Sequence, residues 1–144
     1  MDQSEQMLIE WQLTALSQRF VYFLDNGEFD ALVNVFTPEG VFDRGGTPLR
    51  GHGAIRTAMD ERAPLTTRHL LTNFYYPEVT ADSARGVVGS VVFHGPVPEG
   101  EGPVPYATEQ GRVLEFHDSY VHTSEGWRFE SRVVRPILQP LIWP

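Results

Sequence analysis

The sequence lacks cysteine, long hydrophobic runs and any excess of positive charge. Without cysteine the chain can form no disulfide bond, no thiolate nucleophile and no thiolate metal site. No apolar run reaches the roughly 20 residues that a membrane-spanning helix needs. The 11 Lys and Arg residues against 19 Asp and Glu residues give a net charge of −8, whereas nucleic-acid-binding proteins carry a basic patch or stripe. We therefore expect neither a nucleic-acid partner nor a membrane partner.

The composition is that of a globular protein. Hydrophobic residues make up 41% of the chain and charged residues 21%, a balance that disordered chains do not show. A length of 144 residues suits one domain, which we expect to span residues 1–144. Residues 1–5 have neither the basic nor the apolar segment of a signal peptide, so we predict a cytoplasmic protein.

Hydrophobic spacing predicts helices in the first part of the chain. Residues 5–25 form an amphipathic helix with Ser4 as its N-cap. The apolar stripe of this helix consists of Ile9, Leu13, Leu16, Phe20 and Phe23. Further elements are predicted at 28–36 (helix), 41–43 (strand) and 53–62 (helix).

After Pro64 the composition turns to Val, Phe, Tyr and Thr, which favours strands. The predicted strands are 67–79, 84–94, 106–122 and 127–135. Residues 95–105 are too rich in Gly and Pro to pair as a central strand, so we predict a mobile loop there. Helices followed by an antiparallel meander indicate the α+β class, with the helices on one face of the sheet.

The strand predicted at 84–94 is apolar on both faces. Val88 and Val92 point to one side, and Val87, Val91 and Phe93 point to the other. A sheet with one solvated face alternates more cleanly between apolar and polar residues. The second face therefore covers a pocket, a subunit partner or both, and we predict a homodimer or homotrimer.

Asp25 breaks a local rule at the end of the first predicted helix. A carboxylate in the last turn of a helix faces the negative end of the helix dipole. Residues that break local rules are candidates for a functional role. The alternative is structural, because Asp-Asn-Gly is also favourable turn sequence.

His69 and His94 lie on the two strands of a predicted hairpin. If the turn is centred on Ala81 and Asp82, the two histidines are direct cross-strand neighbours on one face, with Cβ atoms about 5 Å apart. A turn centred two residues later makes them a diagonal pair on the same face. A bulged turn can put them on opposite faces.

Asp25, His69 and His94 together suit proton transfer. A carboxylate fixes the tautomer of a neighbouring imidazole, and a second imidazole supplies another acid or base. The alternatives are a core histidine at position 69 and a strand-end histidine at position 94. Two His and one Asp can also bind a metal, but no compact ligand motif is present, so we predict neither a metal nor a cofactor.

Several motifs in order resemble the SnoaL-like proteins of the NTF2-like superfamily, and most closely their scytalone dehydratase-like branch. The motifs are FLDNGEFDAL at 23–32, FTPEGVF at 36–42, Gly51-x-x-Ala-Ile-Arg, Arg68-His-x-x-Thr-Asn and Gly126-Trp-Arg-Phe. The resemblance implies a cone, in which a curved, mostly antiparallel sheet wraps around N-terminal helices and encloses a pocket. In that branch an Asp after the first helix and two His on neighbouring strands carry the chemistry, at positions matching Asp25, His69 and His94.

The chain departs from that branch at two tyrosines and at a Ser/Asn pair. Leu24 replaces the tyrosine before the Asp. Residues 42–44 lack the tyrosine of the first strand, and residues 112–116 lack the Ser/Asn pair. Tyr22, Asn73 and Tyr75 are therefore our candidates for binding a substrate carbonyl. Asn73 and Tyr75 share strand parity with His69, so we expect them to face the same pocket.

The resemblance and the three candidate catalytic residues predict a cofactor-independent lyase or isomerase of the dehydratase type. Its substrate would be a small, hydrophobic, cyclic, carbonyl-bearing metabolite such as a polyketide or terpenoid. A polyketide cyclase, an epoxide-opening enzyme and a non-catalytic binding or assembly domain are the alternatives. We expect the 95–105 loop and the tail at 136–144 to close the pocket, although the tail suits a subunit contact equally well.

Overall fold

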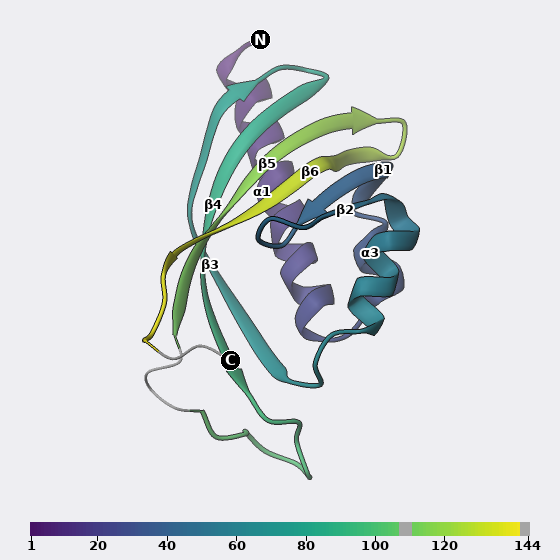
Figure 1. The fold of residues 1–144 in the computed structure, drawn as a ribbon. Helices are drawn as coiled ribbons and strands as arrows, with labels where there is room; N and C mark the ends of the chain where they lie inside the picture. The colour runs from purple at the N-terminus through teal and green to yellow at the C-terminus, as the bar shows by residue number, and fades with distance from the viewer. Residues whose placement is uncertain (107–110, 142–144) are drawn as a thin grey trace.

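A curved six-stranded sheet wraps around one long helix in the computed structural model (Figure 1), which describes residues 1–106 and 111–141. The helices are α1 (Gln3–Asp25), α2 (Phe29–Val33) and α3 (Gly51–Asp60). The strands are β1 (Phe36–Asp43), β2 (Pro48–Arg50), β3 (Thr66–Val79), β4 (Ser83–Gly95), β5 (Arg112–Thr123) and β6 (Gly126–Leu138). The strand order is β2-β1-β6-β5-β4-β3, so the sheet has two open edges. The predicted α+β class is confirmed.

α1 begins two residues earlier than predicted. Asp2, and not Ser4, is the N-cap, because the Asp2 carboxylate accepts a hydrogen bond from the backbone N–H of Glu5 at 2.8 Å. The Glu5 carboxylate in turn accepts one from the Asp2 backbone N–H at 2.9 Å, which completes a capping box. The helix ends at Asp25, and Gly27 follows with φ of +70°, a conformation that glycine adopts without strain.

The region after α2 differs from its prediction. The helix predicted at 28–36 ends at Val33, and the strand predicted at 41–43 extends back to Phe36. This strand, β1, pairs in parallel with β6, with a register shift between Phe36 and Val41. That irregularity accommodates Pro38, which a regular central strand cannot hold because it lacks a backbone N–H. β2 was not predicted.

Strands β3 to β6 form the predicted antiparallel meander. Part of the strand predicted at 106–122 and the end of the tail at 136–144 lie outside the described residues. Residues 96–105 are described and contain neither helix nor strand, as expected for a loop.

The core lies between α1 and the concave face of the sheet. Phe20 of α1 is fully buried and makes edge-to-face contacts with four rings of the sheet. Those rings belong to Phe36, Phe42, Phe116 and Phe129. Aromatic pairs of this kind contribute roughly 0.5–1.5 kcal/mol each beyond the area they bury, so Phe20 fixes the position of α1 against the sheet.

A buried ion pair is embedded in the same core. The Arg132 guanidinium is bound by both carboxylate oxygens of Asp118, each at 2.8 Å, and by Ser17 Oγ at 2.7 Å. Tyr120 donates a further hydrogen bond to Asp118 at 2.8 Å. The guanidinium also lies 4.0 Å from the centroid of the Phe116 ring. The charges are therefore compensated by hydrogen bonds and a cation–π contact.

The convex face of the sheet has no helix over it in Figure 1. Leu70 on β3 is 53% exposed there, and Val87 and Val91 on β4 are only half-buried. In the described part of the chain, no helix is both long and apolar enough to cross a membrane.

Candidate functional site

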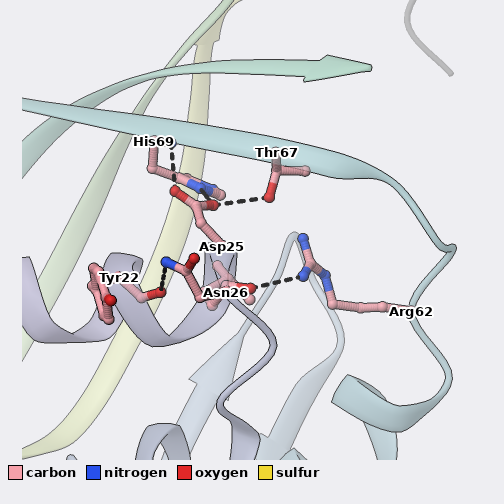
Figure 2. A network of polar contacts seen from close by, with 7 residues as sticks. Tyr22, Asp25, Asn26, Arg62, Thr67 and His69 are labelled. Carbon is pink, nitrogen blue, oxygen red and sulfur yellow. Dashed lines mark hydrogen bonds and ion pairs between the residues drawn. The ribbon is translucent and has the colours of Figure 1, made fainter. Parts of the chain in front are cut away.

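The centre of the candidate site is the carboxylate of Asp25, the last residue of α1 (Figure 2). Its Oδ1 atom accepts hydrogen bonds from His69 Nδ1 at 2.6 Å and from Thr67 Oγ1 at 2.8 Å. Its Oδ2 atom accepts one from the backbone N–H of His69 at 2.9 Å. The Asp25 side chain is 3% exposed and that of His69 is 9% exposed. Helix α1 and strand β3 thus bring together two of the three predicted catalytic residues.

These contacts keep Asp25 ionised in spite of its burial. Burial acts to raise the pKa of the Asp25 carboxyl, because it removes water from the charged form. The hydrogen bonds and charge of His69, together with Thr67, outweigh burial and lower the pKa below its ordinary value of 3.8. The carboxylate is therefore an anion near neutral pH.

The contact with Asp25 fixes the orientation of the His69 ring. An ionised carboxylate only accepts hydrogen bonds, so Nδ1 carries the proton in this pair. In the neutral ring the proton-accepting nitrogen is then Nε2. No other described residue forms a hydrogen bond with the His69 ring. His69 Nε2 is thus left for a ligand.

His69 lies on the wall of a cavity of about 470 Å³. The wall is mixed, and its apolar part comes from α1, β1, β2, α3, β5 and β6. The apolar lining includes Leu24, Phe42, Met59, Leu114, Phe116 and Val134. A cavity of this size suits a small, largely apolar ligand, and it places such a ligand against the imidazole.

Three arginines line the same cavity, and sequence reasoning missed them. Arg44 follows β1, Arg62 follows α3, and Arg112 opens β5. Arg62 donates a hydrogen bond to the Leu24 carbonyl at 3.3 Å, which directs it toward the end of α1 (Figure 2). Their spacing along the chain has no regular pattern, so only the folded structure reveals the group.

The third predicted catalytic residue, His94, lies opposite Thr67, while His69 lies opposite Val92. The two histidines are therefore diagonal neighbours on one face of the sheet, and the predicted direct pairing is wrong. His94 is half-buried and is not among the described residues that line the His69 cavity.

The register of this hairpin explains the difference. Val79 pairs with Ala84, so the turn is centred where it was predicted, on residues 81–82. Two bulges between Thr72 and Glu78 then shift the pairing by two residues. An even shift keeps every side chain on its expected face but displaces its partner along the strand.

Asn73 and Tyr75 do not face the cavity, contrary to the prediction. Asn73 lies in the first bulge with φ of +52°, and its side chain accepts a hydrogen bond from Thr72 Oγ1 at 3.0 Å. Tyr75 is 63% exposed. Strand parity fails as a guide here because a bulge reorients the residues within it.

Tyr22 lies near Asp25 but on the outer side. It is 59% exposed and lines a separate groove between α1 and β3, which Asp25 and His69 also border. Neither Tyr22 nor any of residues 96–105 is among the described residues that line the cavity. The expected closure of the pocket by that loop is therefore not seen.

A family model described as a SnoaL-like domain matches residues 5–133. The chain belongs to the SnoaL-like family. The matched segment contains Asp25, His69, His94 and all three cavity arginines. No curated protein matches the sequence significantly.

Several solved structures share the fold of this SnoaL-like chain. A variant of Rv3472, a protein of unknown function from Mycobacterium tuberculosis, is 25% identical with a TM-score of 0.78, over 93% of this chain and 75% of that one. An NTF2-like protein with a cystatin-like fold from Novosphingobium aromaticivorans is 20% identical with a TM-score of 0.72, over 92% and 84%. A proposed scytalone dehydratase from the same organism is 17% identical with a TM-score of 0.72, over 96% and 97%. The SnoaL-like chain thus has the NTF2-like cone.

Proposed function

We propose that the protein is an acid–base lyase or isomerase of the dehydratase type. The observation that carries this proposal is the 2.6 Å contact between Asp25 Oδ1 and His69 Nδ1, which holds an imidazole that lines a cavity. A buried carboxylate that orients an imidazole toward a ligand is an arrangement for general base catalysis. The substrate is a small cyclic metabolite with a carbonyl group, such as a polyketide or terpenoid.

The reaction begins at a C–H bond next to the substrate carbonyl. His69 Nε2 takes the proton, and the electrons of the C–H bond form an enolate. Asp25 stabilises the imidazolium that results, because its charge lies against Nδ1. In an elimination, the enolate re-forms the carbonyl as the β-hydroxyl leaves as water. In an isomerisation, the proton returns to a different carbon of the substrate.

The leaving hydroxyl needs a proton, and His94 is the proposed donor, directly or through water. It shares the concave face with His69. The enolate oxygen needs a positive partner, and Arg112, which lines the cavity, is better placed for this than Tyr22, Asn73 or Tyr75. Electrostatic stabilisation of this kind is commonly the largest single catalytic contribution.

A homo-oligomer is also proposed, because the convex face of the sheet exposes apolar side chains. Leu70 is 53% exposed on β3, beside the half-buried Val91 of β4. Size-exclusion chromatography with light scattering measures the mass of the protein in solution directly. A mass of two or three chains supports this proposal, and a mass of one chain contradicts it.

A substrate screen tests the proposed activity. Wild-type protein and the His69→Gln variant are incubated with cyclic β-hydroxy ketones, and products are identified by mass spectrometry and NMR. We expect loss of water or a shifted double bond with the wild type, and a rate reduced roughly 10²- to 10⁴-fold in His69→Gln.

His117→Gln is the matched control, since His117 contacts Glu115 at 3.0 Å and does not line the cavity. Ring closure or epoxide opening that depends on His69 would replace the dehydratase assignment with a cyclase or epoxide-opening enzyme. Binding without any turnover would instead support a non-catalytic domain.

A further inference from the structure

The cavity beside His69 concentrates positive charge in a chain that is acidic overall. The net charge is −8, yet Arg44, Arg62 and Arg112 all border this one cavity. Among the described residues, no Asp or Glu side chain lines it. The Asp25 carboxylate, which contacts the lining residue His69, is 3% exposed and is bound by His69 and Thr67. The charged side chains among the described lining residues are therefore all basic.

Arg62 lies partly buried beside the end of α1. It is half-buried, its guanidinium donates to the Leu24 carbonyl at 3.3 Å, and within the described chain it forms no salt bridge. Burial lowers the pKa of Arg62, the Asp25 carboxylate partly offsets this, and the charge of Arg44 lowers the pKa further. A bound anion would compensate both burial and the repulsion from Arg44.

Arg44 lies in a tight turn after β1 and lines the cavity. The Asp43 carboxylate accepts hydrogen bonds from the backbone N–H groups of Gly45 at 3.1 Å and Gly46 at 2.7 Å. Both glycines have positive φ, at +110° and +97°, so other residues would strain this turn. Within the described chain Arg44 forms no salt bridge either, and its side chain is exposed to solvent at the cavity mouth.

We propose that the substrate carries a carboxylate, and that Arg44 and Arg62 bind it. A guanidinium matches a carboxylate in shape and forms short, charge-assisted hydrogen bonds with it. With the anion held by these two arginines, the ring system of the substrate lies against Phe42, Met59 and Phe116. This inference rests on the proposed function in one respect, namely that the reacting carbon then lies beside His69.

The anionic group also explains how a small ligand is oriented against the apolar side chains of the cavity. Apolar walls provide affinity but little direction, whereas one charged contact fixes which end of the ligand points where. The cavity then discriminates against neutral analogues of the same shape, because these leave the half-buried Arg62 guanidinium without an anion. That discrimination is measurable at equilibrium.

Calorimetric titration of three naphthalene probes tests the proposal without requiring turnover. The probes are 2-naphthoate, its neutral analogue 2-naphthamide, and 2-naphthyl phosphate. We expect wild-type protein to bind 2-naphthoate at least about tenfold more tightly than 2-naphthamide, as one or two hydrogen bonds to charged groups would give. Equal affinities for the two would overturn the proposal, and tighter binding of 2-naphthyl phosphate would overturn the carboxylate assignment.

Two variants locate the effect. Arg62→Gln and Arg44→Gln should each reduce the preference for 2-naphthoate by about tenfold. Arg19→Gln removes the same charge from an exposed position on α1 and should leave the preference unchanged. Arg44 is exposed, so its variant remains informative even if Arg62→Gln does not fold. An unchanged preference in Arg44→Gln and in any folded Arg62→Gln would overturn the proposal.

The outcome is distinguishable from a failure of the proposed function. If 2-naphthoate is preferred through the arginines but no substrate reacts through His69, the binding inference stands and the acid–base proposal fails. If His69-dependent turnover occurs while the probes bind equally, the acid–base proposal stands and the binding inference fails.

Discussion

Asp25 keeps a negative charge in a buried position because three donors converge on it. Two of them come from His69 and one from Thr67. β3 supplies all three, since alternate residues of a strand point to the same face. The charge that orients the His69 ring is therefore maintained by a backbone N–H and a hydroxyl as well as by the ring itself.

The pH dependence of stability should report this carboxylate. Its pKa in the folded protein lies below the ordinary value of 3.8, so the folded state binds fewer protons than the unfolded state. The stabilisation is thus complete above pH 3.8 and is lost as pH falls through the folded pKa. We expect Asp25→Asn to lower the free energy of unfolding by about 1.5–3 kcal/mol near pH 7.

Urea unfolding of wild type and Asp25→Asn across pH checks this expectation. The destabilisation that Asp25→Asn causes should shrink as pH falls below 3.8. A difference that stays constant throughout the acid range would show that Asp25 is not the ionised acceptor described above. Asp82→Asn, at an exposed turn position, is the control.

At the scale of elements, the bulges in β3 determine where the polar groups lie. Asn73 adopts φ of +52° in the first bulge, a conformation that costs most residues roughly 1–2 kcal/mol. Asn73→Ala should therefore lower the free energy of unfolding by about 1 kcal/mol, whereas Asn73→Gly should change it little. Equal losses in the two variants, measured by urea unfolding, would show that the bulge is not maintained by this conformation.

The sequence was sufficient for the parts of the fold that depend on local pattern. The stripe of α1, the strands of the meander and the hairpin turn at 81–82 all follow from hydrophobic period and turn residues. The bulges do not, because an inserted residue changes pairing without changing composition. The parallel pairing of β1 with β6 is likewise a long-range choice that no local pattern specifies.

The site shows the same division. Asp25 was found because it breaks a rule of helix termini, and His69 because it interrupts an apolar strand. The arginines were missed, since an arginine after a helix or in a turn is ordinary sequence. Asn73 and Tyr75 were assigned to the wrong face, because strict alternation of side chains along the strand was assumed and a bulge interrupts it.

At the scale of the whole molecule, a buried ion pair supports the floor of the cavity. Phe116 lines the cavity, and the centroid of its ring lies 4.0 Å from the Arg132 guanidinium. Asp118 neutralises that guanidinium with two hydrogen bonds. The cavity beside His69 and the core therefore share a wall.

Breaking this pair should be costly. Asp118→Asn leaves a fully buried guanidinium without its counter-ion, and we expect a loss of about 3–5 kcal/mol in the free energy of unfolding. Replacing both partners, as in Arg132→Met with Asp118→Leu, should cost less than Asp118→Asn alone. Denaturant unfolding compares the variants, and a loss below about 1 kcal/mol for Asp118→Asn would contradict a dry, compensated pair.

Hydrogen–deuterium exchange next to a ketone carbonyl tests most directly whether the Asp25–His69 pair removes a proton there. Cyclic ketones are incubated in D₂O with wild type, His69→Gln and the control His117→Gln, and deuterium next to the carbonyl is measured by NMR. We expect exchange catalysed by wild type and His117→Gln, and a rate reduced roughly 10²-fold or more in His69→Gln. Exchange that proceeds equally well in His69→Gln would contradict the claim that the Asp25–His69 pair moves the proton.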